Sequence, residues 1–123
     1  MSVATSMAPI FPVRDLQRSI AFYEAAFGFE TDATYGEGYA ILSLGEVGLH
    51  LTVWREMDPR ENAGAAYLYV TDVDDLAVRA AAVKGGEMRH DVELKPWGLR
   101  EFAIVDPDGN LLRVGEFAGR AMA

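Results

Sequence analysis

Two histidines, His50 and His90, could act as metal ligands or general bases in this chain. The 123 residues contain no cysteine, which excludes disulfides and thiolate metal sites. His50 has no serine or cysteine nucleophile beside it, so acyl-transfer chemistry lacks its parts. These observations favour a role for His50 as a hydrogen-bonded residue in the wall of a cavity over a role as a catalytic base.

Aromatic side chains offer a different chemistry, the stacking of flat or cationic ligands. Trp and Tyr rings contribute about 0.5–2 kcal/mol for each such contact. Trp97 follows Pro96 in a loop-like segment, where a large ring is hard to explain as packing, so it is the strongest single candidate. For the other rings, core packing stays an open alternative.

Alternation within two segments separates a core face from a polar, aromatic face. In residues 47–54, every odd position is apolar, whereas the even positions include a histidine, a threonine and a tryptophan. That mixture suits a cavity wall better than a dry core. In residues 111–117, Arg113 lies on the face opposite the core positions, where it could contact a ligand or pair with a carboxylate such as Glu101.

Two helical patterns indicate a duplicated module. One begins after Asp15 and ends before Gly28, and the other begins after Asp72 and ends at Gly85. Both aspartates follow a Val-x sequence and are expected to cap their helices. Strands are expected at 10–13, 29–34, 39–44 and 47–54 in the first copy, and at 67–70, 87–92, 99–105 and 111–117 in the second.

These elements predict one domain over residues 1–123. The first module covers about 7–54, the linker 55–64 and the second module about 65–117. Sheets with helices on one side and a polar, aromatic concave face on the other would form a binding cleft.

The charge balance narrows the possible partners. A formal net charge of −8 without a Lys/Arg cluster argues against nucleic acid and anionic membranes, and favours cationic small ligands. An acidic surface that only maintains solubility explains the charge equally well. No apolar run approaches the ~20 residues of a membrane span, and the N-terminus lacks signal-peptide features. A cytoplasmic location is therefore expected.

At this point the pattern resembles a known superfamily, the vicinal oxygen chelate proteins, which include glyoxalases, bleomycin-resistance proteins and dioxygenases. The resemblance rests on Val-Arg-Asp-Leu-x-x-Ser-Ile-x-Phe-Tyr at 13–23 and Asp-Pro-Asp-Gly-Asn at 106–110. The sequence Pro-Trp-Gly-Leu-Arg-Glu-Phe at 96–102 is most similar to the bleomycin-resistance branch. The resemblance implies an α+β fold in which two βαβββ modules form an open, incomplete mixed β-barrel around a cleft, with the helices outside.

The resemblance also identifies the positions that hold a metal in the enzymes of the superfamily. They correspond here to Ala8, His50, Ala65 and Arg113. Alanine cannot coordinate a metal, and a guanidinium repels a dication. We therefore expect no metal and no cofactor.

The resemblance favours a metal-independent protein that sequesters a bleomycin-type antibiotic or another flat cation. It implies a homodimer with clefts across the interface, lined by aromatic side chains, and favours Tyr39, Tyr67 and Trp97 most strongly. The residues expected to contact a ligand are Tyr39, His50, Thr52, Trp54, Tyr67, Tyr69, Trp97, Phe102 and Arg113. Two alternatives stay open. One is a lyase, dioxygenase or isomerase of the same superfamily, with His50 in a metal-free isomerase. The other is an interaction domain whose cleft is vestigial.

Overall fold

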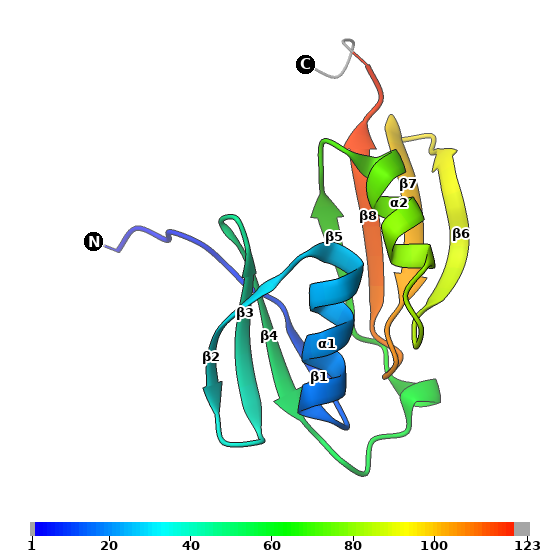
Figure 1. Cartoon of the computed structure of the whole chain (residues 1–123). Coiled ribbons are helices and arrows are strands. Elements are labelled where there is room, and N and C mark those ends of the chain that lie inside the picture. Colours follow the sequence, from blue (N-terminus) through cyan, green and yellow to red (C-terminus); the bar gives the residue numbers. More distant parts are fainter. Residues whose placement is uncertain (1, 120–123) are drawn as a thin grey trace.

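The computed structural model describes residues 2–119 as two modules, each a four-stranded sheet with a helix packed on one face (Figure 1). Met1 and residues 120–123 of the expected domain lie outside the described residues. The first module contains β1 (Ile10–Val13), α1 (Leu16–Phe27), β2 (Glu30–Tyr35), β3 (Tyr39–Leu44) and β4 (Val47–Val53). A 3-10 turn at Pro59–Glu61 precedes the second module, which contains β5 (Ala65–Tyr69), α2 (Val73–Ala81), β6 (Glu87–Leu94), β7 (Leu99–Val105) and β8 (Leu111–Phe117).

The two sheets have the same mixed topology. Their strand orders are β1-β4-β3-β2 and β5-β8-β7-β6. In each sheet the first strand of the module runs parallel to the last, and the other pairs are antiparallel. The predicted βαβββ repeat, the α+β class and the unclosed mixed sheets are thereby confirmed.

Helix α1 begins and ends where the sequence predicts. The side chain of Asp15 accepts a hydrogen bond from the backbone N–H of Arg18 at 3.1 Å. Gly28 closes the helix in the left-handed conformation, at a φ of 83°, which glycine adopts without strain. Arg79 of α2 donates to the carbonyl oxygens of Ala25 and Glu24, so the second module also satisfies the end of this helix.

The predicted cap of α2 is wrong in one respect. Asp72 occupies the N-cap position, but its side chain makes no capping hydrogen bond. Instead, Oε1 of Glu116 on β8 accepts from the backbone N–H of Val73 at 3.1 Å. A tertiary neighbour thus supplies the acceptor, which local sequence rules do not anticipate.

One hydrophobic core runs through both modules. It combines the inward faces of both sheets with the buried sides of both helices, from Phe11 on β1 to Val114 on β8. Tyr23 of α1 lies within it and packs edge-on against Phe22 and Phe29.

The turn between β7 and β8 joins the modules through buried carboxylates. Asp108 is fully buried and accepts from Arg14 and Arg18, each at 2.8 Å, and from Ser19 at 3.2 Å. The same pattern extends to Asp106, which accepts from the Tyr23 hydroxyl at 2.7 Å. These aspartates, predicted only as turn residues, also fix the turn to α1.

Burial affects the ionisation of this junction. It raises the pKa of Tyr23 well above its usual value, and the nearby charge of Asp106 adds to the effect. Burial also raises the pKa of Asp106, although the hydrogen bond from Tyr23 opposes that shift.

Within residues 2–119, no helix is long and apolar enough to cross a membrane.

Candidate functional site

An aromatic ladder crosses the face of the second sheet that is turned away from α2, which we call the second open face. The rings of Tyr67 and Tyr69 on β5 have centroids 4.8 Å apart. Phe117, at the end of β8, stacks on Tyr69 at 5.8 Å with an interplanar angle of 17°. Tyr69 and Phe117 are 60% and 54% exposed, so their ring surfaces are available to a flat ligand.

A buried carboxylate lies on the same face. Glu101 of β7 is fully buried, and its Oε2 accepts from Arg113 of β8 at 3.1 Å. His90 of β6 places Nε2 at 3.2 Å from the same oxygen. The sequence reading left open that Arg113 pairs with Glu101, and the structure shows this pair.

Tyr67 reaches Glu101 by passing over a glycine. Gly115 of β8 pairs with Glu101 across the sheet, and a Cβ at position 115 would lie 2.4 Å from the Tyr67 hydroxyl oxygen. Burial raises the pKa of Tyr67, nearby Trp97 lowers it, and the neighbouring Glu101 carboxylate raises it further. The hydroxyl of Tyr67 therefore lies beside both Glu101 and Trp97.

Trp97, the strongest sequence candidate, is 53% exposed in the turn between β6 and β7. The ammonium group of Lys95 lies 5.9 Å from the centre of its ring and also pairs with Glu93. This intramolecular cation–π contact shows that the indole face can accept a cation.

The first open face, on the side of the first sheet away from α1, carries four further candidates. The Tyr39 hydroxyl and His50 Nδ1 are joined by a hydrogen bond of 2.6 Å. Thr52 pairs with Tyr39 across the strands and is half-buried. Trp54 follows β4 and is 57% exposed. Within β4, His50 and Thr52 follow the alternation predicted for residues 47–54.

Phe102 does not lie on an open face. It is fully buried in the core, on the side of β7 that faces the helices, and pairs with Val114. Because side chains alternate along a strand, Phe102 and Glu101 point to opposite faces. The buried ring of Phe102 therefore does not offer the expected ligand contact, and the side chain of its neighbour Glu101 lies on the side of the second open face.

Sequence reasoning missed two other side chains on the second open face, Phe117 and His90. Phe117 shares the parity of Arg113, so the alternation already used for 111–117 could have found it. His90 lies in β6, within the predicted strand 87–92, but between two shifts of register. Only the folded sheet reveals that it faces Glu101.

The four positions that hold a metal in enzymes of the suspected superfamily do not form a metal site here. Ala8 and Ala65 offer no donor atom, and the Arg113 guanidinium is bound to Glu101. His50 is the one side chain of the set with a suitable donor, and Tyr39 occupies one of its ring nitrogens. This donor set does not fit a divalent cation.

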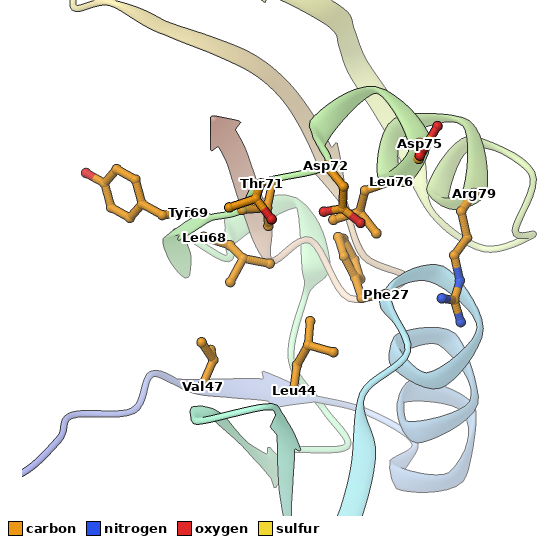
Figure 2. A pocket seen from close by; sticks show the side chains of 11 residues that line it. Phe27, Leu44, Val47, Leu68, Tyr69, Thr71, Asp72, Asp75, Leu76 and Arg79 are labelled. Atoms are coloured by element: carbon orange, nitrogen blue, oxygen red, sulfur yellow. The ribbon is translucent and has the colours of Figure 1, made fainter. Parts of the chain in front are cut away.

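A separate groove lies between the modules on the side of the helices. Figure 2 shows Leu44 and Val47 of the first module opposite Leu68 of the second. Asp72 at the start of α2, and Asp75 and Arg79 within α2, also line the groove. Its volume is about 410 Å³. Tyr69 is the one predicted site residue that borders it, so the groove is distinct from the Glu101 cluster.

Comparison with known proteins places this chain in a family. Residues 6–114 match the family model described as "Glyoxalase/Bleomycin resistance protein/Dioxygenase superfamily". A bleomycin resistance protein of Geobacillus stearothermophilus is 32% identical over 124 residues, covering 85% of this chain and 90% of that protein. One from Klebsiella pneumoniae is 32% identical over 114 residues, covering 86% and 87%.

Solved structures of similar proteins have the same fold as this chain. The crystal structure of a bleomycin resistance determinant encoded on transposon Tn5 superposes with a TM-score of 0.82 at 29% identity, covering 93% of this chain and 98% of that one. A bleomycin-binding protein complexed with bleomycin gives 0.79 at 29% identity, covering 92% and 98%. This chain belongs to the glyoxalase/bleomycin resistance protein/dioxygenase superfamily.

Proposed function

We propose that this protein binds a bleomycin-type antibiotic, or another flat cation, and sequesters it without chemical conversion. The observation that carries the proposal is the second open face, where Phe117 stacks on Tyr69, the Tyr67 ring lies tilted against Tyr69, and the exposed ring of Trp97 lies near Tyr67. Such a surface offers several ring faces to a planar ligand. The net charge of −8 would attract a cation at long range.

Relatives support the ligand class. The similar proteins are bleomycin resistance proteins, and one of the matching structures is a complex with bleomycin. A second, the bleomycin-binding protein of Streptomyces verticillus, is complexed with copper(II)-bleomycin and superposes with a TM-score of 0.77 at 27% identity.

We also propose that the functional unit is a homodimer whose clefts form between open faces of two chains. Large apolar side chains on or beside these faces are more than half exposed in the single chain: Ile10, Trp54, Tyr69, Trp97 and Phe117. The strand orders leave β1 and β5 at sheet edges, where a second chain could approach. Light scattering on the purified protein tests this assembly, and a monomer at micromolar concentration would overturn it.

Titration with metal-free bleomycin, followed by tryptophan fluorescence, tests the binding proposal. Trp54 and Trp97 are the two indoles of the chain. The expected result is saturable quenching with one site per chain and a dissociation constant of about 1 μM or lower. Trp97→Ala should abolish binding, whereas Trp54→Phe keeps Trp97 as the reporter. A flat titration of folded protein would remove bleomycin as the ligand.

One observation favours a second candidate, a metal-free isomerase. The 2.6 Å bond between Tyr39 and His50 orients the imidazole on an open face, as a general base would require. The test is turnover of a small metabolite that disappears in His50→Ala and persists in Trp97→Ala. The opposite dependence favours sequestration.

A further inference from the structure

A cavity of about 400 Å³, which we call the arginine cavity, lies at one end of the second open face. Residues from all four strands of the second sheet border it, together with the segment before β5. Ala65 pairs with Leu111 at this end, whereas Phe117 pairs with Leu99 at the other. Small-molecule sites have volumes of about 300–1,000 Å³. The cavity therefore has room for a ligand away from the exposed ring of Phe117.

The lining of the arginine cavity is basic, although the protein is acidic. The chain has 19 aspartates and glutamates against 11 lysines and arginines. Arg89, His90 and Arg113 line the cavity, and among the described residues that border it there is no aspartate or glutamate. The local charge is thus opposite in sign to that of the whole chain, and it attracts an anion.

A β-bulge brings Arg89 and His90 to the cavity together. The register of β6 shifts between Met88 and His90, so that β6 advances two residues while β7 advances one. Residues two apart on a regular strand share a face, but here Met88 packs against the core and His90 faces Glu101 on the open side. Arg89 is the extra residue, and it lines the cavity beside His90. Bulges are common beside active sites, where they re-aim side chains.

The two arginines keep most of their hydrogen-bond donors free. A guanidinium carries five N–H donors. Within residues 2–119, Arg113 donates one hydrogen bond, to Glu101, and Arg89 donates none. The Glu87 carboxylate lies 3.9 Å from Arg89 Nη1, beyond hydrogen-bond distance, and is 77% exposed. Both ring nitrogens of His90 already lie beside oxygen atoms, so His90 forms part of the wall.

The shape and the rest of the lining favour a carboxylate on a compact body over a bare ion. A planar guanidinium can bind a carboxylate through two parallel hydrogen bonds. Much of the remaining surface is small or apolar, and includes Ala65, Ala103 and Leu111. An inorganic ion alone would leave most of the volume unfilled.

We propose that the arginine cavity binds a small organic acid. Its carboxylate accepts hydrogen bonds from Arg89 and Arg113, and its apolar body lies against Ala65 and Ala103. This inference goes beyond the proposed function, which concerns flat cations and the exposed rings, and it does not depend on it.

Benzoate and benzamide test the site, because they share a shape and differ in charge. NMR chemical-shift titration measures the affinity of each probe at low ionic strength. The wild-type protein should bind benzoate about tenfold or more tightly than benzamide. Added salt should weaken benzoate binding and leave benzamide binding nearly unchanged. The amides that shift should include those of Arg89 and Arg113.

Three variants locate the effect. Arg89→Gln removes a charge that has no structural partner, so the protein should fold and lose most of its preference for benzoate. Arg55→Gln, the matched control, removes an exposed arginine that follows β4 and should keep the preference. Ala65→Leu adds apolar volume beside the cavity without changing its charge, so it should weaken both probes alike.

The outcomes separate this proposal from sequestration. Equal affinities for the two probes in the wild-type protein, or a preference that folded Arg89→Gln retains, would overturn the site. Inorganic phosphate that binds as tightly as benzoate and depends equally on Arg89 would overturn the organic acid in favour of a bare ion. A failed bleomycin titration with an intact benzoate preference would reject sequestration alone.

Discussion

The two open faces of this molecule share one framework and differ in their chemistry. His50 on β4 pairs with Ile10 and Ile41, and Arg113 on β8 pairs in the same way with Tyr67 and Ala103. The side chains of His50 and Arg113 each bind a residue on the third strand of their own module. The first face uses the hydrogen bond between the Tyr39 hydroxyl and His50 Nδ1, and the second uses the ion pair between Glu101 and Arg113.

The residues around these pairs also differ. Tyr67 on the second face takes the place of Ile10 on the first, and Gly115 takes the place of Thr52. The glycine gives the Tyr67 ring room to cross β8, which a side chain at that position would deny. The first face thus carries a hydrogen-bonded polar pair, whereas the second carries an ion pair beside an aromatic ladder. We infer that the second face recognises the ligand and the first acts as a wall.

The largest contrast is expected in stability. Arg113→Ala should lower the free energy of unfolding by about 2 kcal/mol, because it leaves the buried Glu101 charge with only His90 as partner. That value is reduced from the usual cost of breaking a buried pair because the Arg113 side chain is 45% exposed. His50→Ala, the matched variant on the first face, should cost about 1 kcal/mol or less. Urea unfolding measures both, and equal losses would contradict the difference between the faces.

The next contrast concerns the room that glycine provides. Gly115→Ala should weaken metal-free bleomycin binding by about tenfold, because the new Cβ displaces the Tyr67 ring. Gly48→Ala on β4 is the control, since its Cβ would make an ordinary 3.4 Å contact with Ala8. Fluorescence titration compares the two variants. A Gly115→Ala protein with unchanged affinity would show that the position of Tyr67 does not matter for binding.

A smaller effect is expected at the ends of the last strands. Phe117→Leu removes the ring that stacks on Tyr69 and should weaken bleomycin binding by about threefold. Trp54→Leu removes the ring at the corresponding position of the first face and should weaken bleomycin binding less than Phe117→Leu does. Calorimetric titration is suitable, because it does not depend on either indole. Equal losses would show that both faces take part in recognition.

The smallest effect concerns pH. Burial is the main cause that raises the folded-state pKa of Tyr67 above its ordinary value of 10.0. The associated stability is therefore fully present below pH 10 and is lost as the pH rises through the folded-state pKa. Tyr67→Phe should lose less stability than the wild-type protein over that alkaline range, as measured by urea unfolding at each pH. Tyr35→Phe, which removes an exposed phenol, controls for the loss of one tyrosine.

The sequence predicted more of the fold than of the site. Strands 39–44, 99–105 and 111–117 and helix 16–27 have the expected bounds, because their apolar periods and turn residues are local signals. Tyr67 and Tyr69 were placed together by the same alternation. Phe102 was misplaced although the bounds of strand 99–105 were right, because apolar residues occupy both parities of this strand and no alternation separates its two faces.

The sequence by itself determined the duplicated modules, the helix starts and the faces of the strands, since each depends on residues that are near neighbours in the chain. Only the tertiary structure decided that His90, Glu101 and Arg113 meet, that Gly115 makes room for Tyr67, and that Glu116 caps α2. These contacts join different strands, or a strand and a helix, and their geometry depends on strand register and bulges that no local pattern specifies.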